Sequence, residues 1–174
     1  MDTLTELFRH NLWANLRVLD ACAGLNDEQL DATAPGTYGR VRDTLLHILA
    51  CEEIYVNLLT DHEPVHTLSA GIGFPSFDEL RQRARRSGEK LVGIAAGIEP
   101  TQVLRGTWLT KPNAWQGKPF AIQAAIPLIQ AINHGTEHRS HVATILSQSG
   151  IRPPWLDAWA YGVEHGFVEV GSPT

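Results

Sequence analysis

Three histidines share one face of a predicted helix in the carboxyl-terminal part of the chain. The stretch AINHGTEHRSHVATI, residues 131–145, places them at positions 134, 138 and 141. At about 100° per residue, His138 lies roughly 40° to one side of His134 and His141 roughly 20° to the other. Side chains that share a face in this way can converge on a metal ion, but they need a further ligand from another part of the fold.

The rise of a helix limits which of these histidines can bind the same ion. Residues four apart lie roughly 6 Å apart along the axis, whereas His134 and His141 lie roughly 10.5 Å apart. One ion can therefore bind His134 with His138, or His138 with His141, but hardly all three. An HxxxH pair on a helix is a moderately specific pattern for a metal site.

A fourth histidine, His47, lies in the middle of a predicted apolar helix face. A lone histidine there is more often a core residue than a ligand, but a second inward face that carries HxxxH favours the ligand interpretation. Cys51, one turn later, can ligate or can pack as a small hydrophobe. The predicted face recurs at steps of three and four residues: Thr44, His47, Cys51, Ile54 and Leu58.

A second HxxxH in the letters, His62 and His66, has Pro64 between its histidines. Proline disfavours a helix interior, so the spacing has no geometric meaning here. We expect both histidines to be surface residues.

Size and charge exclude several classes of protein. A chain of 174 residues fits a single domain, residues 1–174, with an ordinary core. A net charge of −5 and a pI near 5.9 argue against a nucleic-acid partner. No apolar run approaches the roughly 18 residues that span a bilayer, so no membrane partner is expected. Two cysteines and no secretion signal favour a reducing, cytoplasmic location.

Apolar periodicity predicts an all-α fold, a four-helix bundle with the histidine site in or at the mouth of its core. Residues 101–120 form a long crossover between the third and fourth helices, either a short hairpin or an extended connection. The tail is expected to pack back on the body as a short helix. The four helices are predicted over residues 3–22, 40–59, 76–98 and 121–149.

Helix starts and polar residues give further expectations. Thr3 with Glu6 and Ser76 with Glu79 have the spacing of capping boxes. Asn11 and Asn15 fall on or beside the apolar stripe of the first helix, where they either hydrogen-bond in the core or form a polar wall of a pocket. For Arg139 and Glu52 the simple expectation is an ion pair on the bundle surface.

Three segments together resemble the DinB-like (DinB/YfiT) family of bacterial metalloenzymes. They are WANLRVLDACAGLNDEQLDA (13–32), RVRDTLLHILACEE (40–53) and HGTEHRSHVATILSQSG (134–150). The resemblance implies that His47, His134 and His138 bind the metal. Family members usually continue the last motif as HRGQ, whereas this chain has His141 where glutamine is usual. That difference leaves open which adjacent pair is used; we favour the four-residue spacing.

The resemblance also implies a homodimer, and a small-molecule substrate is expected. Imidazole ligands suit a divalent transition metal, zinc or nickel and also iron. Three imidazoles with open positions are typical of catalytic centres. The site is expected to activate water, as a hydrolase, or a low-molecular-weight thiol, as an S-transferase. The candidate catalytic residues are Glu137, as a base or imidazole partner, and His141, as a neighbour of the ligands or a pocket residue. The alternative is a non-catalytic metal-binding or stress-associated bundle protein.

Overall fold

The computed structural model describes residues 2–60, 73–107, 117–169 and 171. Within these residues the fold is mainly helical, with six helices and one two-stranded sheet, so the all-helical prediction is confirmed only in broad outline. No helix in the described ranges is both long and apolar enough to span a membrane. The elements are α1 (Thr3–Cys22), α2 (Asp27–Leu30), α3 (Val41–Thr60), α4 (Phe77–Gly97), β1 (Val103–Thr107), β2 (Pro119–Gln123), α5 (Ala125–Gln148) and α6 (Ala158–Glu164).

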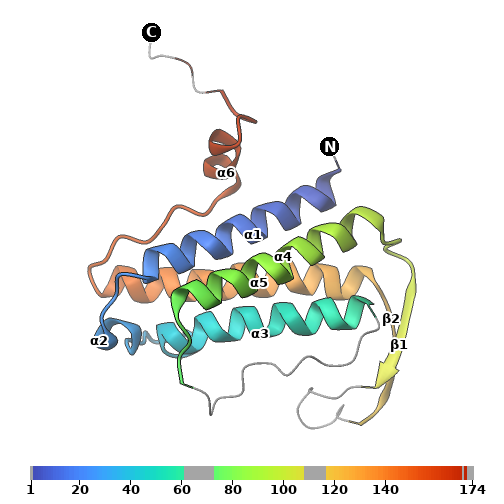
Figure 1. Cartoon of the computed structure of the whole chain (residues 1–174), viewed down its shortest axis with the longest axis horizontal. Coiled ribbons are helices and arrows are strands. Elements are labelled where there is room, and N and C mark those ends of the chain that lie inside the picture. Colours follow the sequence, from blue (N-terminus) through green and yellow to red (C-terminus); the bar gives the residue numbers. More distant parts are fainter. Residues whose placement is uncertain (1, 61–72, 108–116, 170, 172–174) are drawn as a thin grey trace.

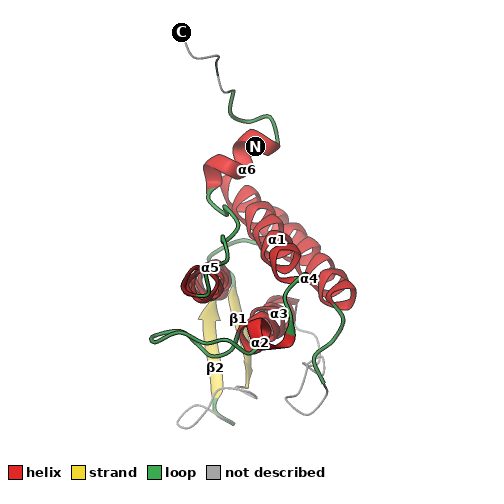
Figure 2. Ribbon diagram, turned by 90° about the vertical axis from the view of Figure 1, so that its left-hand side faces the viewer, coloured by secondary structure: helices red, strands yellow, loops and turns green. Residues whose placement is uncertain are grey.

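The four long helices pack side by side (Figures 1 and 2). Helix α1 packs mainly on α4, and α3 mainly on α5, while contacts of α3 with α4 and of α1 with α5 complete the ring. Helices α1 and α5 run in one direction and α3 and α4 in the opposite one (Figure 1). The two predicted histidine-bearing helices, α3 and α5, are therefore direct neighbours.

Local interactions explain where the helices begin. The carboxylate of Asp2 accepts from the Thr5 backbone N–H at 2.9 Å, so Asp2 caps α1 and the predicted Thr3 cap is wrong. Ser76 caps α4 as predicted, because its hydroxyl accepts from the backbone N–H of Glu79 at 3.2 Å.

Of the two forms predicted for the crossover, a hairpin or an extended connection, the structure has the paired strands of a hairpin, and this pairing shortens the last long helix. Strands β1 and β2 pair antiparallel, with Leu104 opposite Ile122. This pairing holds residues 119–123 extended, so α5 begins at Ala125 and not near residue 121 as predicted. The expected short helix in the tail is also present as α6.

Two apolar clusters make up most of the core, and a layer of buried polar side chains separates them; a third, small cluster consists of Trp13, Ala14 and Tyr161. Phe8, Leu59 and Leu91 belong to one cluster, and Leu19, Leu45 and others to the second. On each long helix the polar residues fall between the residues of the two clusters. We call them the polar layer: Asn11 and Asn15 of α1, Glu52 of α3, Ser87 of α4 and Arg139 of α5.

The buried face of α3 differs from the predicted one. His47 and Cys51 are only half-buried and lie at the edge of the core, whereas Glu52 lies within it. The prediction was wrong because it placed the charged Glu52 on the outer face of the helix. The predicted inward face is therefore rotated from the observed one by about one residue, or roughly 100°. The residues of the true buried face are Val41, Thr44, Leu45, Ile48, Leu49, Glu52, Tyr55, Val56 and Leu59.

Helix α6 lies beside α1 (Figure 1) and packs against it through an aromatic contact. The ring of Tyr161 lies 5.5 Å from the rings of both Trp13 and His10, and its hydroxyl donates to the Glu6 carboxylate. This docking leaves the tail tryptophan Trp159 73% exposed.

Candidate metal centre

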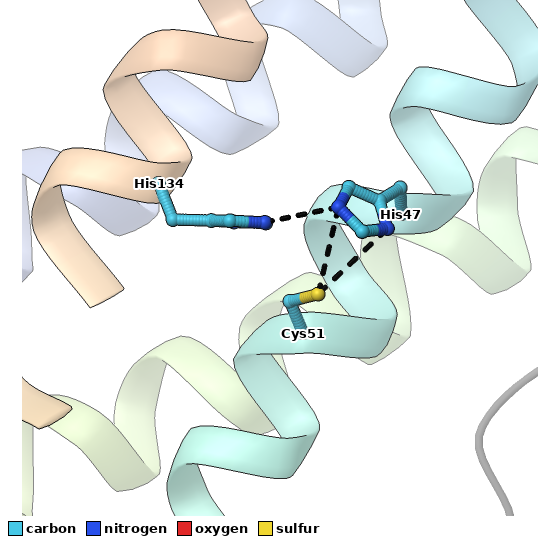
Figure 3. A group of neighbouring side chains, drawn as sticks. All are labelled: His47, Cys51 and His134. Carbon is cyan, nitrogen blue, oxygen red and sulfur yellow. Dashed lines mark hydrogen bonds between the residues drawn. The ribbon is translucent and has the colours of Figure 1, made fainter. Parts of the chain in front are cut away.

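Helices α3 and α5 bring two histidines and a cysteine together (Figure 3). The Nε2 atoms of His47 and His134 lie 3.0 Å apart. Cys51 follows His47 by one turn on α3, and its Sγ lies 3.7 Å from Nε2 of His47. The candidate ligand atoms of all three side chains lie within 4.8 Å of one another, and all three residues are half-buried. The group is therefore compact and accessible from the edge of the core.

His138 lies beside this group. Its ring centroid is 4.3 Å from that of His134 and 4.7 Å from that of His47, both in edge-to-face geometry. The three histidines that the family resemblance implies as ligands are thus gathered at one place. Among the described residues, the compact group of donor atoms consists of His47, Cys51 and His134, and His138 is not part of it.

These distances fit the requirements of a transition metal. Two nitrogens bound tetrahedrally at about 2.0–2.1 Å lie roughly 3.4 Å apart, and a nitrogen and a thiolate sulfur roughly 3.6 Å apart. The observed separations are 3.0 Å for His47 and His134 and 3.7 Å for His47 and Cys51. The shorter distance also suits an N–H···N hydrogen bond between neutral rings. The geometry therefore supports a metal site without requiring one.

Burial keeps the imidazoles in their ligating form. It lowers the pKa of His47, and it lowers the pKa of His138 together with the nearby charges of His47 and His141. A neutral imidazole has a lone pair for a metal, whereas an imidazolium does not. Both rings are accordingly ready to bind a cation at neutral pH.

Two tyrosines that the sequence pattern did not predict as site residues border the histidines. The ring of Tyr38 stacks on that of His47 at 4.1 Å and meets His138 edge-on at 5.0 Å. The ring of Tyr55 lies 5.8 Å from that of His134. Tyr38 precedes α3 and is 50% exposed. It therefore forms an aromatic wall between the histidines and solvent.

Comparison with known proteins shows the family to which the chain belongs. The model of the DinB family matches residues 1–165. The chain belongs to the DinB family. A crystal structure of a DinB-like protein from Bacillus cereus ATCC 10987 superposes with a TM-score of 0.63, over 88% of this chain and 95% of that one. At 18% identity, that similarity shows the fold alone. No curated protein matches the chain.

In this DinB family member, the two predicted catalytic residues, His141 and Glu137, differ from each other in burial and in their contact with His138. His141 is half-buried, and its Nδ1 lies 3.3 Å from Nδ1 of His138. Glu137 is exposed, and its negative charge opposes the lowering of the His138 pKa. His62 and His66 lie outside the described residues.

The polar layer includes buried residues of both helices that carry the candidate ligands, α3 and α5. The amides of Asn11 and Asn15 donate to Glu52 Oε1 at 2.7 and 2.8 Å and accept from Nη1 of Arg139 at 2.7 and 2.6 Å. Ser87 donates to Glu52 Oε2 at 2.6 Å. Glu52 and Arg139 are only 3% and 4% exposed, so the predicted surface ion pair is wrong. The predicted core hydrogen bonding of the two asparagines is confirmed.

Gly135→Ala is expected to destabilise the protein by about 1–3 kcal/mol, as overpacking typically does. An added Cβ would lie 2.8 Å from both the Arg139 guanidinium and the Asn11 amide oxygen. The matched control is Gly93→Ala on α4, where an added Cβ meets nothing within 4 Å. That change should stabilise by roughly 0.5–1 kcal/mol, because alanine favours a helix interior. Urea unfolding measures both, and equal effects would contradict the close approach of α5 and α1.

Proposed function

We propose that this DinB family member binds one divalent transition-metal ion through His47 and His134, with His138 as the third ligand, and acts as a metal-dependent enzyme. The observation that carries the proposal is the 3.0 Å approach of two imidazole nitrogens from different helices. Imidazole ligands suit zinc and nickel, and also iron. Three protein ligands leave further positions for a small-molecule substrate.

The contact between His138 and His141 supports His138 as a ligand. A metal-bound histidine commonly shares its other ring nitrogen with a hydrogen-bonding partner, which fixes the tautomer. The 3.3 Å contact joins the two Nδ1 atoms, and it leaves Nε2 of His138 for a metal. His141 is thus proposed to orient His138.

Cys51 is the alternative third ligand, because its sulfur belongs to the compact group with His47 and His134. Cobalt(II) distinguishes the two donor sets, since a bound thiolate adds an intense near-ultraviolet charge-transfer band. With His138 as the ligand, the band is absent, Cys51→Ser binds cobalt normally and His138→Ala binds weakly. The opposite pattern identifies Cys51.

His141→Ala is expected to weaken cobalt(II) binding by about 10–100-fold, the usual cost of losing a partner of a metal-bound histidine. The reason is that His138 would lose the group that holds its tautomer and ring orientation. A competitive titration with a chromophoric chelator measures the change. If His141→Ala abolishes binding while His134→Ala does not, the metal uses the pair His138 and His141 and the proposed site is wrong.

When bound, such a metal would lower the pKa of a coordinated water or of the thiol of a small cofactor, giving a hydrolase or an S-transferase. The protein's own groups have separate proposed roles. His141 and Glu137 are proposed to hold or transfer protons near His138. The exposed Tyr38 ring borders the approach to His47 and would contact an incoming substrate.

Activity assays test the enzyme proposal directly. Metal-loaded protein is incubated with a small thiol and a model aromatic electrophile, and separately with activated esters and amides. Turnover that is lost in His134→Ala supports an enzyme and identifies its class. Full metal loading with no turnover in either panel favours the alternative, a non-catalytic metal-binding protein.

We also propose that the protein forms a homodimer. The exposed side chains of Trp155 and Trp159, at 72% and 73%, offer apolar surface for such an association. Sedimentation equilibrium tests this: a monomer at micromolar concentration contradicts it.

A further inference from the structure

We infer that the polar layer is a positioning device for the metal centre, in which the bonds of Glu52 and Arg139 set the rotation of α3 and α5. This inference rests on the proposed metal site and adds to it a set of residues that do not touch the metal. The layer joins all four long helices through hydrogen bonds between buried side chains.

Two members of the layer directly follow candidate ligands along the chain. Glu52 follows Cys51 on α3, and Arg139 follows His138 on α5. Neighbouring residues on a helix point in directions about 100° apart. When hydrogen bonds hold Glu52 or Arg139 toward α1, the direction of the preceding candidate ligand is therefore fixed as well. Rotation of either helix would therefore both break the layer and separate the ligands.

The hydrogen bonds of the layer define a single arrangement. Each asparagine uses its NH₂ group on Glu52 Oε1 and its oxygen on Arg139 Nη1, so neither amide can flip without losing both bonds. The second carboxylate oxygen of Glu52 accepts from Ser87. Polar networks in which every group is satisfied rigidify a core and specify one packing.

Stability alone does not account for these charges. Well-packed apolar residues of similar volume often stabilise a core as well as, or better than, a buried ion pair. The layer also requires a close approach, because an added Cβ at Gly135, the residue after His134, would meet both Arg139 and Asn11. The layer therefore fixes the positions of α1, α3 and α5 relative to one another, which non-directional apolar contacts would not do.

The test compares Glu52→Gln with Glu52→Leu. Glutamine can accept from both asparagines through its oxygen and donate its NH₂ to Ser87, whose hydroxyl then donates to the Arg83 carbonyl at 3.1 Å. Leucine keeps the volume and loses every bond. Cobalt(II) affinity and the d–d absorption spectrum are measured on folded protein. We expect Glu52→Gln to resemble the wild type and Glu52→Leu to bind about 10–100-fold more weakly, as loss of outer supporting groups does, with an altered spectrum.

A second variant covers the case in which Glu52→Leu does not fold. Glu52→Leu with Arg139→Met removes both charges, so no charge is left buried alone. It is expected to fold and still to bind cobalt(II) weakly, with an altered spectrum. If a folded variant without the layer binds cobalt(II) with wild-type affinity and spectrum, the inference is wrong. If the wild type itself does not bind, the proposed metal site is wrong instead.

Discussion

His47→Ala and His134→Ala are each expected to lower the affinity for cobalt(II) or zinc by at least about 100-fold, above the 10–100-fold typical for loss of an outer partner. These two imidazoles are common to both candidate donor sets, and their Nε2 atoms lie 3.0 Å apart. Competitive titration against a chelator measures the loss.

A matched control separates this effect from a general loss of structure. His10 is a half-buried histidine on α1 whose Nε2 contacts the Leu156 carbonyl at 2.9 Å, in the α6 docking contact and outside the centre. His10→Gln should therefore keep wild-type metal affinity. Full stoichiometric metal in both alanine variants would show that His47 and His134 are not the ligands.

Glu52→Leu is expected to lower the free energy of unfolding by about 3–5 kcal/mol, the usual cost of leaving a buried charge without its compensating charge. Arg139 would keep its guanidinium in the core without a counter-charge, although burial already lowers its pKa to about 10. Asn11 and Asn15 would each lose the acceptor for their NH₂ group. Urea unfolding of the metal-free protein measures the change.

The control for this prediction is Glu89→Leu, which removes an exposed carboxylate of α4. It should change the free energy of unfolding by no more than about 0.5 kcal/mol, as surface substitutions usually do. A loss below about 1 kcal/mol in Glu52→Leu would contradict the buried placement of this carboxylate.

Much of the helical architecture could be predicted from the sequence. Apolar periodicity predicted the ends of the long helices to within a few residues, because burial of one apolar stripe is the main determinant of an amphipathic helix. Boundaries that depend on non-local pairing were missed. Residues 121–123 fit a helical pattern, yet they pair with β1, and nothing within the segment itself encodes that partner.

The rotation of α3 could not be predicted for a related reason. A carboxylate is normally expected outside the core, because burial raises its pKa, as it does for Glu52. Hydrogen bonds from Asn11, Asn15 and Ser87 and the nearby charge of Arg139 partly offset that effect. These partners come from three other helices. A single-helix pattern therefore placed His47 deep in the core, whereas the fold leaves it at the edge, where a site has to be accessible.

The candidate centre was predicted in part. Helical spacing and the family resemblance gave His47, His134 and His138, and the structure brings their rings together. Tyr38 was missed because its position depends on the loop before α3, which carries no periodic pattern. The role of Cys51 was left open by the sequence, and its sulfur belongs to the compact donor group.

A crystal structure of the zinc-loaded protein, with anomalous data on both sides of the zinc edge, tests the central claim most directly. The proposal predicts one anomalous peak per chain between α3 and α5, about 2.0–2.1 Å from an imidazole nitrogen of both His47 and His134. The third protein ligand will be visible in the same map. An absence of anomalous density between these two histidines, at full zinc loading of the crystal, would contradict the proposed metal centre.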